Sequence, residues 1–234
     1  MKNLLFTLAL LVSFSSFGQT AEEYYNSGND KADAKDDYGA IADYTKAIEL
    51  VPNFADAYFN RGNSKSNLKD DYGAIADYTK VIELVPNYYK AYYNRGNKKL
   101  NLKDVYGAIA DYTKAIELEP NYADAYYNRG NSKRKLKDYY GAIADYTKAI
   151  ELNPNYSIAY YNRGISKDDL KDDYGAIADY TKAIELNPNY TNAYINRSIL
   201  KEKLGDLTGA CADAKLAANL GHSESANWVA SNCN

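Results

Sequence analysis

The chain of 234 residues is poor in the side chains from which metal and nucleophile sites are built. It has one histidine and two cysteines, and it lacks the HExxH, paired CxxC, glycine-rich phosphate-loop and nucleophile-elbow motifs. The single histidine, His222, follows Gly221, a residue type that often ends a helix, so we expect it in a solvated loop. The sequence therefore predicts no enzyme, no metal site and no cofactor.

An excess of positive charge is also absent. The 28 lysines and arginines are outnumbered by 31 aspartates and glutamates, which gives a net charge of −3. No global basic field is available to hold a nucleic-acid backbone or an anionic membrane surface. Two lysine-rich stretches, 97–103 and 131–137, are flanked by acidic units, and we interpret them as solvated helix surface. We therefore expect no nucleic-acid partner.

Long apolar runs are absent outside the first twenty residues. There the sequence MKNLLFTLALLVSFSSFGQT places Lys2 before an apolar stretch over 4–12 and small residues at Ser16 and Gly18. This layout is typical of a secretory signal, whereas about ten apolar residues are too few for a membrane span, which needs roughly 20. We predict a signal peptide over 1–18 that is cleaved after Gly18, no membrane span, and a mature protein that is periplasmic or secreted.

Proline is scarce but strictly periodic. All five prolines lie 34 residues apart, and they divide most of the chain into six units: 21–54, 55–88, 89–122, 123–156, 157–190 and 191–224. When each unit is numbered from 1 to 34, proline occupies position 32, glycine recurs at position 8, and alanine recurs at positions 20 and 27. Small residues at helical spacing predict two closely packed antiparallel helices in each unit. We expect the proline to end the second helix and the asparagine after it to cap the next first helix.

The unit, with small residues at positions 8, 20 and 27, tyrosine at positions 4 and 24 and proline at position 32, resembles the tetratricopeptide repeat. The resemblance covers 21–224 and implies an all-α fold, an α-solenoid of six helix-turn-helix units. It further implies a scaffold that binds a protein or peptide partner in a concave groove. Residues 225–234 are expected to form a C-terminal capping helix, with Trp228 and Val229 against the last unit. Tyrosines at positions 4, 18 and 24 are expected in the core.

Two polar positions depart from the family pattern. Position 7 is arginine in five units and position 11 is lysine in all six, where the family usually has an apolar and an aromatic residue. An aspartate at position 23 of every unit offers a partner for the arginine, either within the unit or in the neighbouring unit, and the sequence leaves both registers open. Removal of one partner costs about 3–5 kcal/mol if the pair is buried, and less than about 1 kcal/mol if it is exposed.

The same resemblance implies that positions 2, 5, 9 and 12 of each first helix line the groove. We predict a row of aromatic rings beside a row of asparagines, with a basic centre. The residues concerned are Tyr25, Phe59, Tyr93, Tyr127 and Tyr161 at position 5, Asn63, Asn97 and Asn131 at position 9, and Lys90, Arg134 and Lys135. One alternative is that the position-5 rings serve only to stack neighbouring units on one another. Another is a carbohydrate-binding module of the cell envelope, because tyrosine rings and asparagine amides also suit sugars. The lysines with which some family members clamp a terminal carboxylate are absent from position 5, so that activity is not implied.

The groove assignment predicts a contrast between adjacent tyrosines. The rings at position 5 should expose surface to a ligand, whereas those at position 4 should be buried. The pairs concerned are Tyr93 and Tyr92, Tyr127 and Tyr126, and Tyr161 and Tyr160.

The two cysteines lie close to the C-terminus. Cys211 is at position 21, where other units have isoleucine, on a face expected to meet the following helix. In the sixth unit the following helix is the terminal one, which ends at Cys233. We predict a disulfide between Cys211 and Cys233 in the exported protein, with a stabilisation of roughly 3 kcal/mol from closing a loop of about 20 residues.

Overall fold

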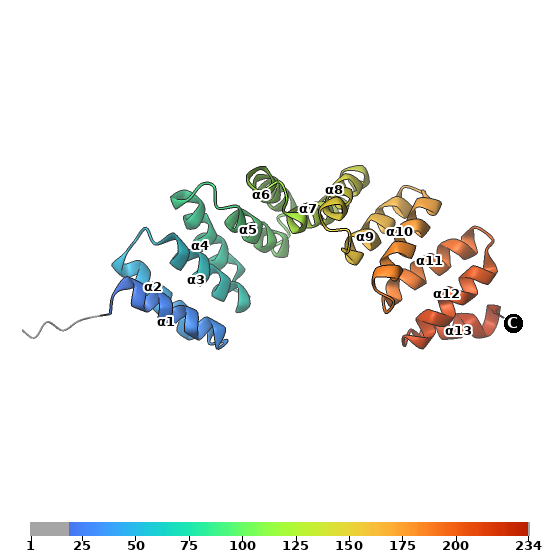
Figure 1. Cartoon of the computed structure of the whole chain (residues 1–234), viewed down its shortest axis with the longest axis horizontal. Coiled ribbons are helices and arrows are strands. Elements are labelled where there is room, and N and C mark those ends of the chain that lie inside the picture. Colours follow the sequence, from blue (N-terminus) through green and yellow to red (C-terminus); the bar gives the residue numbers. More distant parts are fainter. Residues whose placement is uncertain (1–18, 234) are drawn as a thin grey trace, which may run out of the picture.

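The computed structural model describes residues 19–233, in which every regular element is an α-helix (Figure 1). Thirteen helices follow one another along this part of the chain: α1 (Ala21–Asp33), α2 (Asp37–Leu50), α3 (Ala55–Asn67), α4 (Asp71–Leu84), α5 (Tyr89–Asn101), α6 (Val105–Leu118), α7 (Ala123–Lys135), α8 (Tyr139–Leu152), α9 (Ser157–Asp169), α10 (Asp173–Leu186), α11 (Thr191–Lys203), α12 (Leu207–Asn219) and α13 (Ser223–Asn232). The predicted signal sequence, residues 1–18, lies outside the described residues. Among the described helices, none is both long and apolar enough to cross a membrane. The predicted all-α fold with two helices per unit is confirmed.

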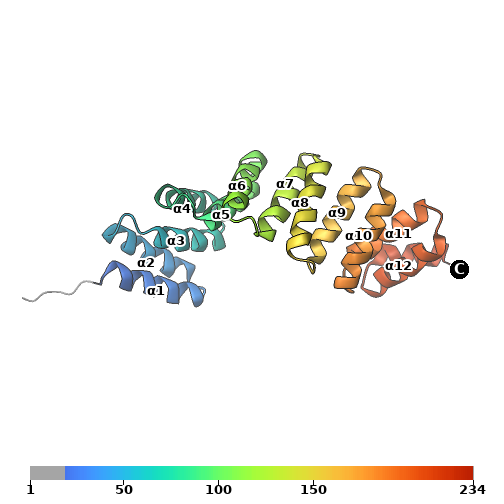
Figure 2. The same cartoon turned by 45° about the horizontal axis from the view of Figure 1, so that its top comes forward.

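The helices pack in the order of the chain. Each odd-numbered helix packs against the even-numbered helix that follows it, and that helix packs against the next odd-numbered one. Repetition of this step builds the arch in Figure 1, and Figure 2 shows the same succession turned by 45°. Odd-numbered helices of neighbouring units also contact one another, as α5 does with α7 and α7 with α9. The first helices of the units therefore form the concave surface of the solenoid.

The core of each unit is built from small residues around one tyrosine. Residues at positions 20 and 27 are fully buried, and the tyrosine at position 24 of the first five units is at most 1% exposed. A Cβ atom on Gly130 would lie 2.9 Å from Cε1 of Tyr146, so glycine at position 8 is required by the ring opposite it. In the sixth unit Ala214 replaces the tyrosine and Ser198 replaces the glycine. The predicted core assignment of position 24 is confirmed.

The tyrosines at position 18 do not lie in the core, and the expectation for them is wrong. Their side chains are 75–77% exposed, and they are Tyr38, Tyr72, Tyr106, Tyr140 and Tyr174. Each residue of an α-helix turns by roughly 100°, so position 18 lies roughly 200° around the helix from the buried alanine at position 20. The rings therefore point away from the partner helix.

The turn between the two helices of a unit uses lysine in the left-handed region of backbone conformation. In the first five units this lysine, at position 15, has φ between 61° and 66°, and the sixth unit has Gly205 there with φ 86°. The next residue is an aspartate whose Oδ1 accepts a hydrogen bond from the backbone N–H three residues later, at 2.9–3.0 Å. This aspartate caps the second helix of every unit.

The first helices of units two to six begin without a side-chain cap, so the predicted asparagine cap is wrong. Their N-cap residue is the aromatic at position 34, from Phe54 to Tyr190, one residue after the asparagine. The ring of each position-34 residue packs instead against the position-5 ring of the unit that it ends, which precedes the helix that it caps. The ring centres are 4.7–5.1 Å apart. Aromatic packing therefore occupies the place of a polar cap.

The arginine at position 7 pairs with the aspartate of its own unit. In the fourth unit Arg129 Nε and Nη2 donate to the two carboxylate oxygens of Asp145 at 2.9 and 2.7 Å. Its Nη1 donates to the Thr113 hydroxyl of the preceding unit, and Lys133 forms an ion pair of 2.8 Å with the same carboxylate. Asp145 is buried. This network holds a unit together and also links it to the unit before it.

The first unit uses a variant of this network, because position 7 is Ser27. The Ser27 hydroxyl and Lys31 Nζ both bond to the Asp43 carboxylate at 2.6 Å. Burial by itself would raise the pKa of Asp43, but the hydrogen bonds from Lys31 and Ser27 lower it below its ordinary value. The aspartate that lacks an arginine is therefore still held in its charged form.

The last helix closes the C-terminal end of the array. Helix α13 packs against α12, and Trp228 and Val229 are half-buried. Cys211 in α12 and Cys233 form a disulfide with Cα atoms 5.6 Å apart, inside the range of about 7 Å that such a bond requires. The bridge ties the end of the chain to the sixth unit.

Candidate binding groove

The position-5 side chains lie on the concave surface but also pack between units. The Tyr127 ring centre lies 5.9 Å from that of the buried Tyr146 and 5.1 Å from that of Tyr156. The Tyr127 hydroxyl accepts a hydrogen bond from Asn162 of the next unit at 2.8 Å. Similar stacking surrounds the other predicted residues of this row, Tyr25, Phe59, Tyr93 and Tyr161. Each of these rings is half-buried and contributes to the stacking of units as well as to the groove.

The adjacent tyrosines at position 4 are half-buried too, so the predicted contrast between the two rows is wrong for Tyr92, Tyr126 and Tyr160. The guanidinium of the arginine three residues later lies over each of these rings, 5.4–5.6 Å from the ring centre. A cation is attracted to an aromatic face. Each of these rings therefore packs against the guanidinium of the Arg–Asp network.

Asn29, Asn63 and Asn97 at position 9 each accept hydrogen bonds from two sides, whereas Asn131 accepts, among the described residues, only from the Tyr146 hydroxyl. Asn97 Oδ1 accepts from the Tyr112 hydroxyl at 2.7 Å and from Asn128 Nδ2 of the next unit at 3.1 Å. The same two bonds reach Asn29 and Asn63. Burial raises the pKa of Tyr44, which bonds to Asn29, to about 12. The phenol therefore keeps its proton at neutral pH, and it fixes the asparagine with its oxygen towards the core.

Because the amide oxygen is occupied, the Nδ2 group is the part of each asparagine that is open to a ligand. Within residues 19–233 no hydrogen bond uses the Nδ2 of Asn29, Asn63, Asn97 or Asn131. Between the first two units, Asn29, Asn60 and Asn63 line a hollow of about 390 Å³. The row therefore presents hydrogen-bond donors, which match the carbonyl oxygens of an extended peptide.

The row of asparagines ends at Asn131. Position 9 is Ile165 in the fifth unit and Ile199 in the sixth, and the buried Tyr180 hydroxyl of the fifth unit has no hydrogen-bond partner. The predicted basic residues lie before this change: Lys90 and Lys135 are exposed and Arg134 is half-buried. The concave surface thus changes along its length from amides, through positive charge, to aliphatic side chains.

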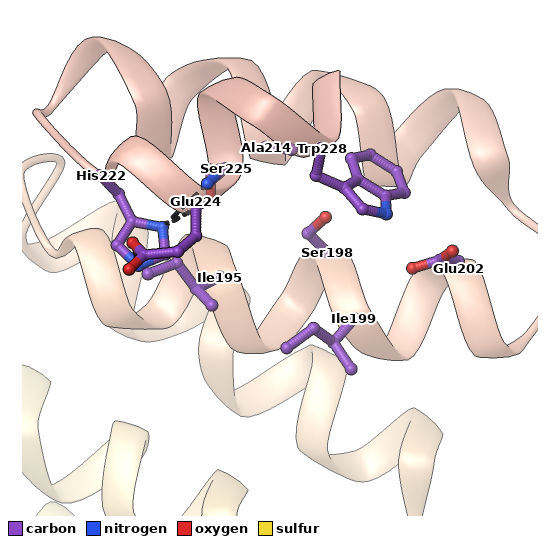
Figure 3. A pocket seen from close by; sticks show the side chains of 9 residues that line it. All are labelled: Ile195, Ser198, Ile199, Glu202, Ala214, His222, Glu224, Ser225 and Trp228. Carbon is purple, nitrogen blue, oxygen red and sulfur yellow. Dashed lines mark hydrogen bonds and ion pairs between the residues drawn. The ribbon is translucent and has the colours of Figure 1, made fainter. Parts of the chain in front are cut away.

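An apolar pocket occupies the C-terminal end of the groove, between α11 and α13 (Figure 3). Its volume is about 210 Å³, and its lining residues are Ile195, Ser198, Ile199, Glu202, Ala214, His222, Glu224, Ser225 and Trp228. In Figure 3 the indole of Trp228 lies across the pocket from Ile199. The sequence did not predict this pocket. The available signal was that α13 begins 32 residues after α11, close to the repeat of 34, and takes the place of the first helix of a further unit.

His222 does not lie in a free loop, contrary to expectation, because it is the N-cap residue of α13. Its Nδ1 accepts the backbone N–H of Ser225 at 3.2 Å, and its Nε2 lies 3.0 Å from the Glu224 carboxylate. A backbone hydrogen bond and the His222 charge lower the pKa of Glu224. Both ring nitrogens are engaged in this arrangement. In residues 19–233 no cluster of three or more His, Cys, Asp or Glu side chains is arranged to hold a metal ion.

These stacked helix pairs, with a concave face and a closed end, define a helical-repeat scaffold of the kind that mediates protein interactions. Tetratricopeptide repeat models match residues 23–68, 55–88, 102–136, 123–156 and 157–190. These matches cover more than half of the chain, which belongs to the tetratricopeptide repeat (TPR) family.

Solved TPR structures share the fold. MamA is 26% identical, with a TM-score of 0.69 over 74% of this chain and 94% of MamA. YrrB, described as a TPR protein with an unusual peptide-binding site, is 24% identical, with a TM-score of 0.68 over 79% of this chain and 96% of YrrB. PilF from Pseudomonas aeruginosa is 17% identical, with a TM-score of 0.74 over 90% of this chain and 97% of PilF. No curated protein matches the sequence significantly.

Proposed function

We propose that this protein is an exported, non-enzymatic scaffold that binds an extended segment of another protein along its concave groove. The observation that carries the proposal is a row of free amide donors that leads to an apolar pocket on the same concave surface. A peptide in extended conformation presents backbone carbonyl oxygens at regular intervals, and side chains between them can enter pockets. The same fold carries a peptide-binding site in YrrB.

The apolar pocket is the anchor of the proposed interaction. Its volume of about 210 Å³ is several times the volume of about 30 Å³ that one water molecule occupies in liquid water. The pocket therefore has room for a large apolar side chain. Ile199 on its wall is 56% exposed, and burial of such apolar surface by a partner is favourable. The amides then orient the segment while the pocket contributes most of the affinity.

The carbohydrate alternative has less support from the geometry. Binding of sugar rings relies on open aromatic faces, whereas the position-5 ring of Tyr127 packs against both Tyr146 and Tyr156. Asparagine donors are compatible with sugar hydroxyls, so a glycan array remains a necessary arm of the test.

Export rests on two features. The pattern of residues 1–18 is that of a secretory signal, and a structural disulfide such as Cys211–Cys233 persists in oxidising compartments. We expect the full chain, expressed in a bacterium, to be recovered from the periplasm or medium with a new N-terminus at Gln19 and no free thiol. Recovery of the uncleaved chain from the cytoplasm with two free thiols would contradict export.

The groove is tested by selection from a displayed library of random linear peptides on three proteins: the wild type, Ile199→Asp and the convex-face control Tyr106→Asp. We expect the wild type and the control to enrich peptides that share an apolar residue, and Ile199→Asp to lose them. Ile199 and Tyr106 are both largely exposed, so neither change should unfold the array. Absence of any enriched peptide, with specific signals on a glycan array, would favour the carbohydrate alternative.

A further inference from the structure

The groove contains one arginine that has no carboxylate partner among the described residues. Position 12 of the six units is occupied by Ala32, Ser66, Leu100, Arg134, Asp168 and Glu202, so Arg134 is the only cation in this row. Its Nε is buried and has no hydrogen-bond partner, and the described residues include only one other such side-chain atom, the Tyr180 hydroxyl. Within residues 19–233 no salt bridge reaches its guanidinium, including from Asp168 at the same position of the next unit.

The other arginines of the chain are fully engaged, and they show what such a group binds in this fold. Each of the five lies at position 7 and donates from Nε and Nη2 to the two oxygens of one aspartate, as Arg129 does to Asp145. Paired donation from one edge of the guanidinium is the geometry in which arginine recognises a carboxylate. Arg134 lies near the Tyr146 hydroxyl but has no carboxylate beside it among the described residues.

The surroundings of Arg134 coincide with the end of the asparagine row. Asn131 precedes it by one helical turn, and in the next unit Ile165 replaces the asparagine, which leaves the Tyr180 hydroxyl unpartnered. Burial raises the pKa of Tyr127, Tyr146 and Tyr161, and the positive charge of Arg134 opposes part of that rise for each, together with a hydrogen bond from Arg134 in the case of Tyr146. The guanidinium therefore lies close to three phenols from two neighbouring units, in the concave surface between them.

We propose that Arg134 forms an anion subsite in the groove that binds the carboxylate of an aspartate or glutamate side chain in the bound segment. The inference rests on the proposed peptide-binding function and specifies the chemistry of the partner. An extended segment that spans the groove would place a carboxylate at Arg134, between the amide donors of the preceding units and the aliphatic residues that follow. A guanidinium in a half-buried site gains more from a carboxylate than an exposed lysine does, because solvent screens it less.

The test compares peptide selection from the random linear library on the wild type, Arg134→Glu and Lys137→Glu. Lys137 is the matched control, because it lies three residues further on, carries the same charge, is exposed and is not among the predicted groove residues. We expect a recurring Asp or Glu in wild-type and Lys137→Glu selections, and its loss or replacement by Lys or Arg on Arg134→Glu. Arg134→Gln provides a second variant, and thermal unfolding of each protein shows that it is folded.

Affinities of one selected peptide complete the test. Exchange of its acidic residue for the amide should weaken binding to the wild type by about tenfold or more, and should leave binding to Arg134→Gln unchanged. Peptides without an acidic position, or an acidic preference that survives Arg134→Glu, would overturn the subsite and leave the groove function standing. An equal effect of Lys137→Glu would overturn the subsite and show that the acidic preference comes from general charge attraction. Failure to enrich any peptide would overturn both proposals.

Discussion

At the scale of single residues, the core is specified by pairs of positions that change together within the chain. Glycine at position 8 accompanies tyrosine at position 24 in five units, and Ser198 accompanies Ala214 in the sixth. The smaller Ala214 leaves space for a side chain opposite, and the Ser198 hydroxyl uses it to donate to the Ala210 carbonyl at 2.9 Å. The size of one side chain thus determines what its neighbour can be.

Substitution of Gly130 by alanine should destabilise the array even though alanine is the better helix former. The new Cβ would lie 2.9 Å from the Tyr146 ring, and overpacking of this kind costs about 1–3 kcal/mol, against a helix-propensity gain of about 1 kcal/mol. Urea unfolding monitored by circular dichroism measures the balance. Ser198→Gly, the opposite exchange in the sixth unit, should destabilise as well, because it removes a hydrogen bond and adds a flexible residue. A stabilisation of about 1 kcal/mol by Gly130→Ala would contradict the close contact.

Replacement of Asp145 by asparagine should be among the most damaging polar substitutions. It leaves Arg129 and Lys133 without their shared counter-charge in a site where the aspartate is 4% exposed, and such losses cost about 3–5 kcal/mol. The matched control is Lys148→Gln on the same helix, which breaks the exposed pair with Glu151 and should not change the urea midpoint measurably. Equal, small effects of both substitutions would show that the buried network does not stabilise the fold.

The residue-scale errors of sequence analysis have separate causes. The exposure of Tyr106 was deducible, because a helix that buries Ala108 must turn the residue two places earlier outward. The half-burial of Tyr126 was not deducible, since it depends on where the Arg129 guanidinium lies. Asn128 bonds to Tyr93, 35 positions earlier, and to Asn97, 31 positions earlier. These bonds depend on the geometry of two stacked units, which the sequence alone does not give.

At the scale of elements, the period of 34 residues was sufficient to predict every helix pair, while the helix ends were predicted less well. The proline and asparagine after the second helix of the first five units indicated a cap, but the aromatic at position 34 is the N-cap residue. Competition between a polar cap and aromatic stacking is decided by tertiary contacts, which a single sequence does not contain. The aspartate caps, in contrast, could have been predicted from the Asp-x-x-Gly spacing before each second helix.

The turn between the helices of a unit contains a correctable strain. Lys103 has φ 65°, a conformation that costs an L-residue about 1–2 kcal/mol, and the sixth unit has Gly205 at the equivalent place. Lys103→Gly should therefore raise stability by about 0.5 kcal/mol or more, once the greater flexibility of glycine in the unfolded chain is subtracted. Gly205→Ala is the reverse change and should lower the unfolding midpoint. A loss of stability in Lys103→Gly together with a gain in Gly205→Ala would contradict the backbone argument.

At the scale of the whole molecule, the same polar links recur at successive interfaces and tie the array together. Arg129 reaches back to Thr113, and Asn128 reaches back to Tyr93, so each unit depends on the one before it. In a repeat array, stability is the sum of such units and interfaces, and its ends need closure. The disulfide from Cys211 to Cys233 and helix α13 provide that closure at one end. The row of linked asparagines stops at the fifth unit, where Ile165 replaces the asparagine. At the same place the groove changes from amide to aliphatic side chains.

The buried phenols predict how the array responds to alkaline pH. Burial raises the pKa of the position-24 tyrosines, to about 12 for Tyr44, above the value of about 10 in an unfolded chain. A raised pKa in the folded state means that the stabilisation is fully present below pH 10 and is lost as pH rises towards 12 and beyond. We expect loss of helical circular dichroism in that range to coincide with a rise in phenolate absorbance near 295 nm.

A tyrosine-to-phenylalanine pair tests the origin of this alkaline unfolding. Tyr180→Phe removes a buried phenol that has no hydrogen-bond partner, so it should be neutral or stabilising at pH 8 and should raise the pH of the unfolding midpoint. Tyr146→Phe removes a phenol that donates to Asn131 at 2.7 Å, and it should lower stability at pH 8 by about 1 kcal/mol. Both variants lose the same ionisable group, so both should show a weaker dependence of stability on pH between 10 and 12. An unchanged dependence in both would mean that other groups drive the alkaline transition and that these rings ionise without unfolding the array.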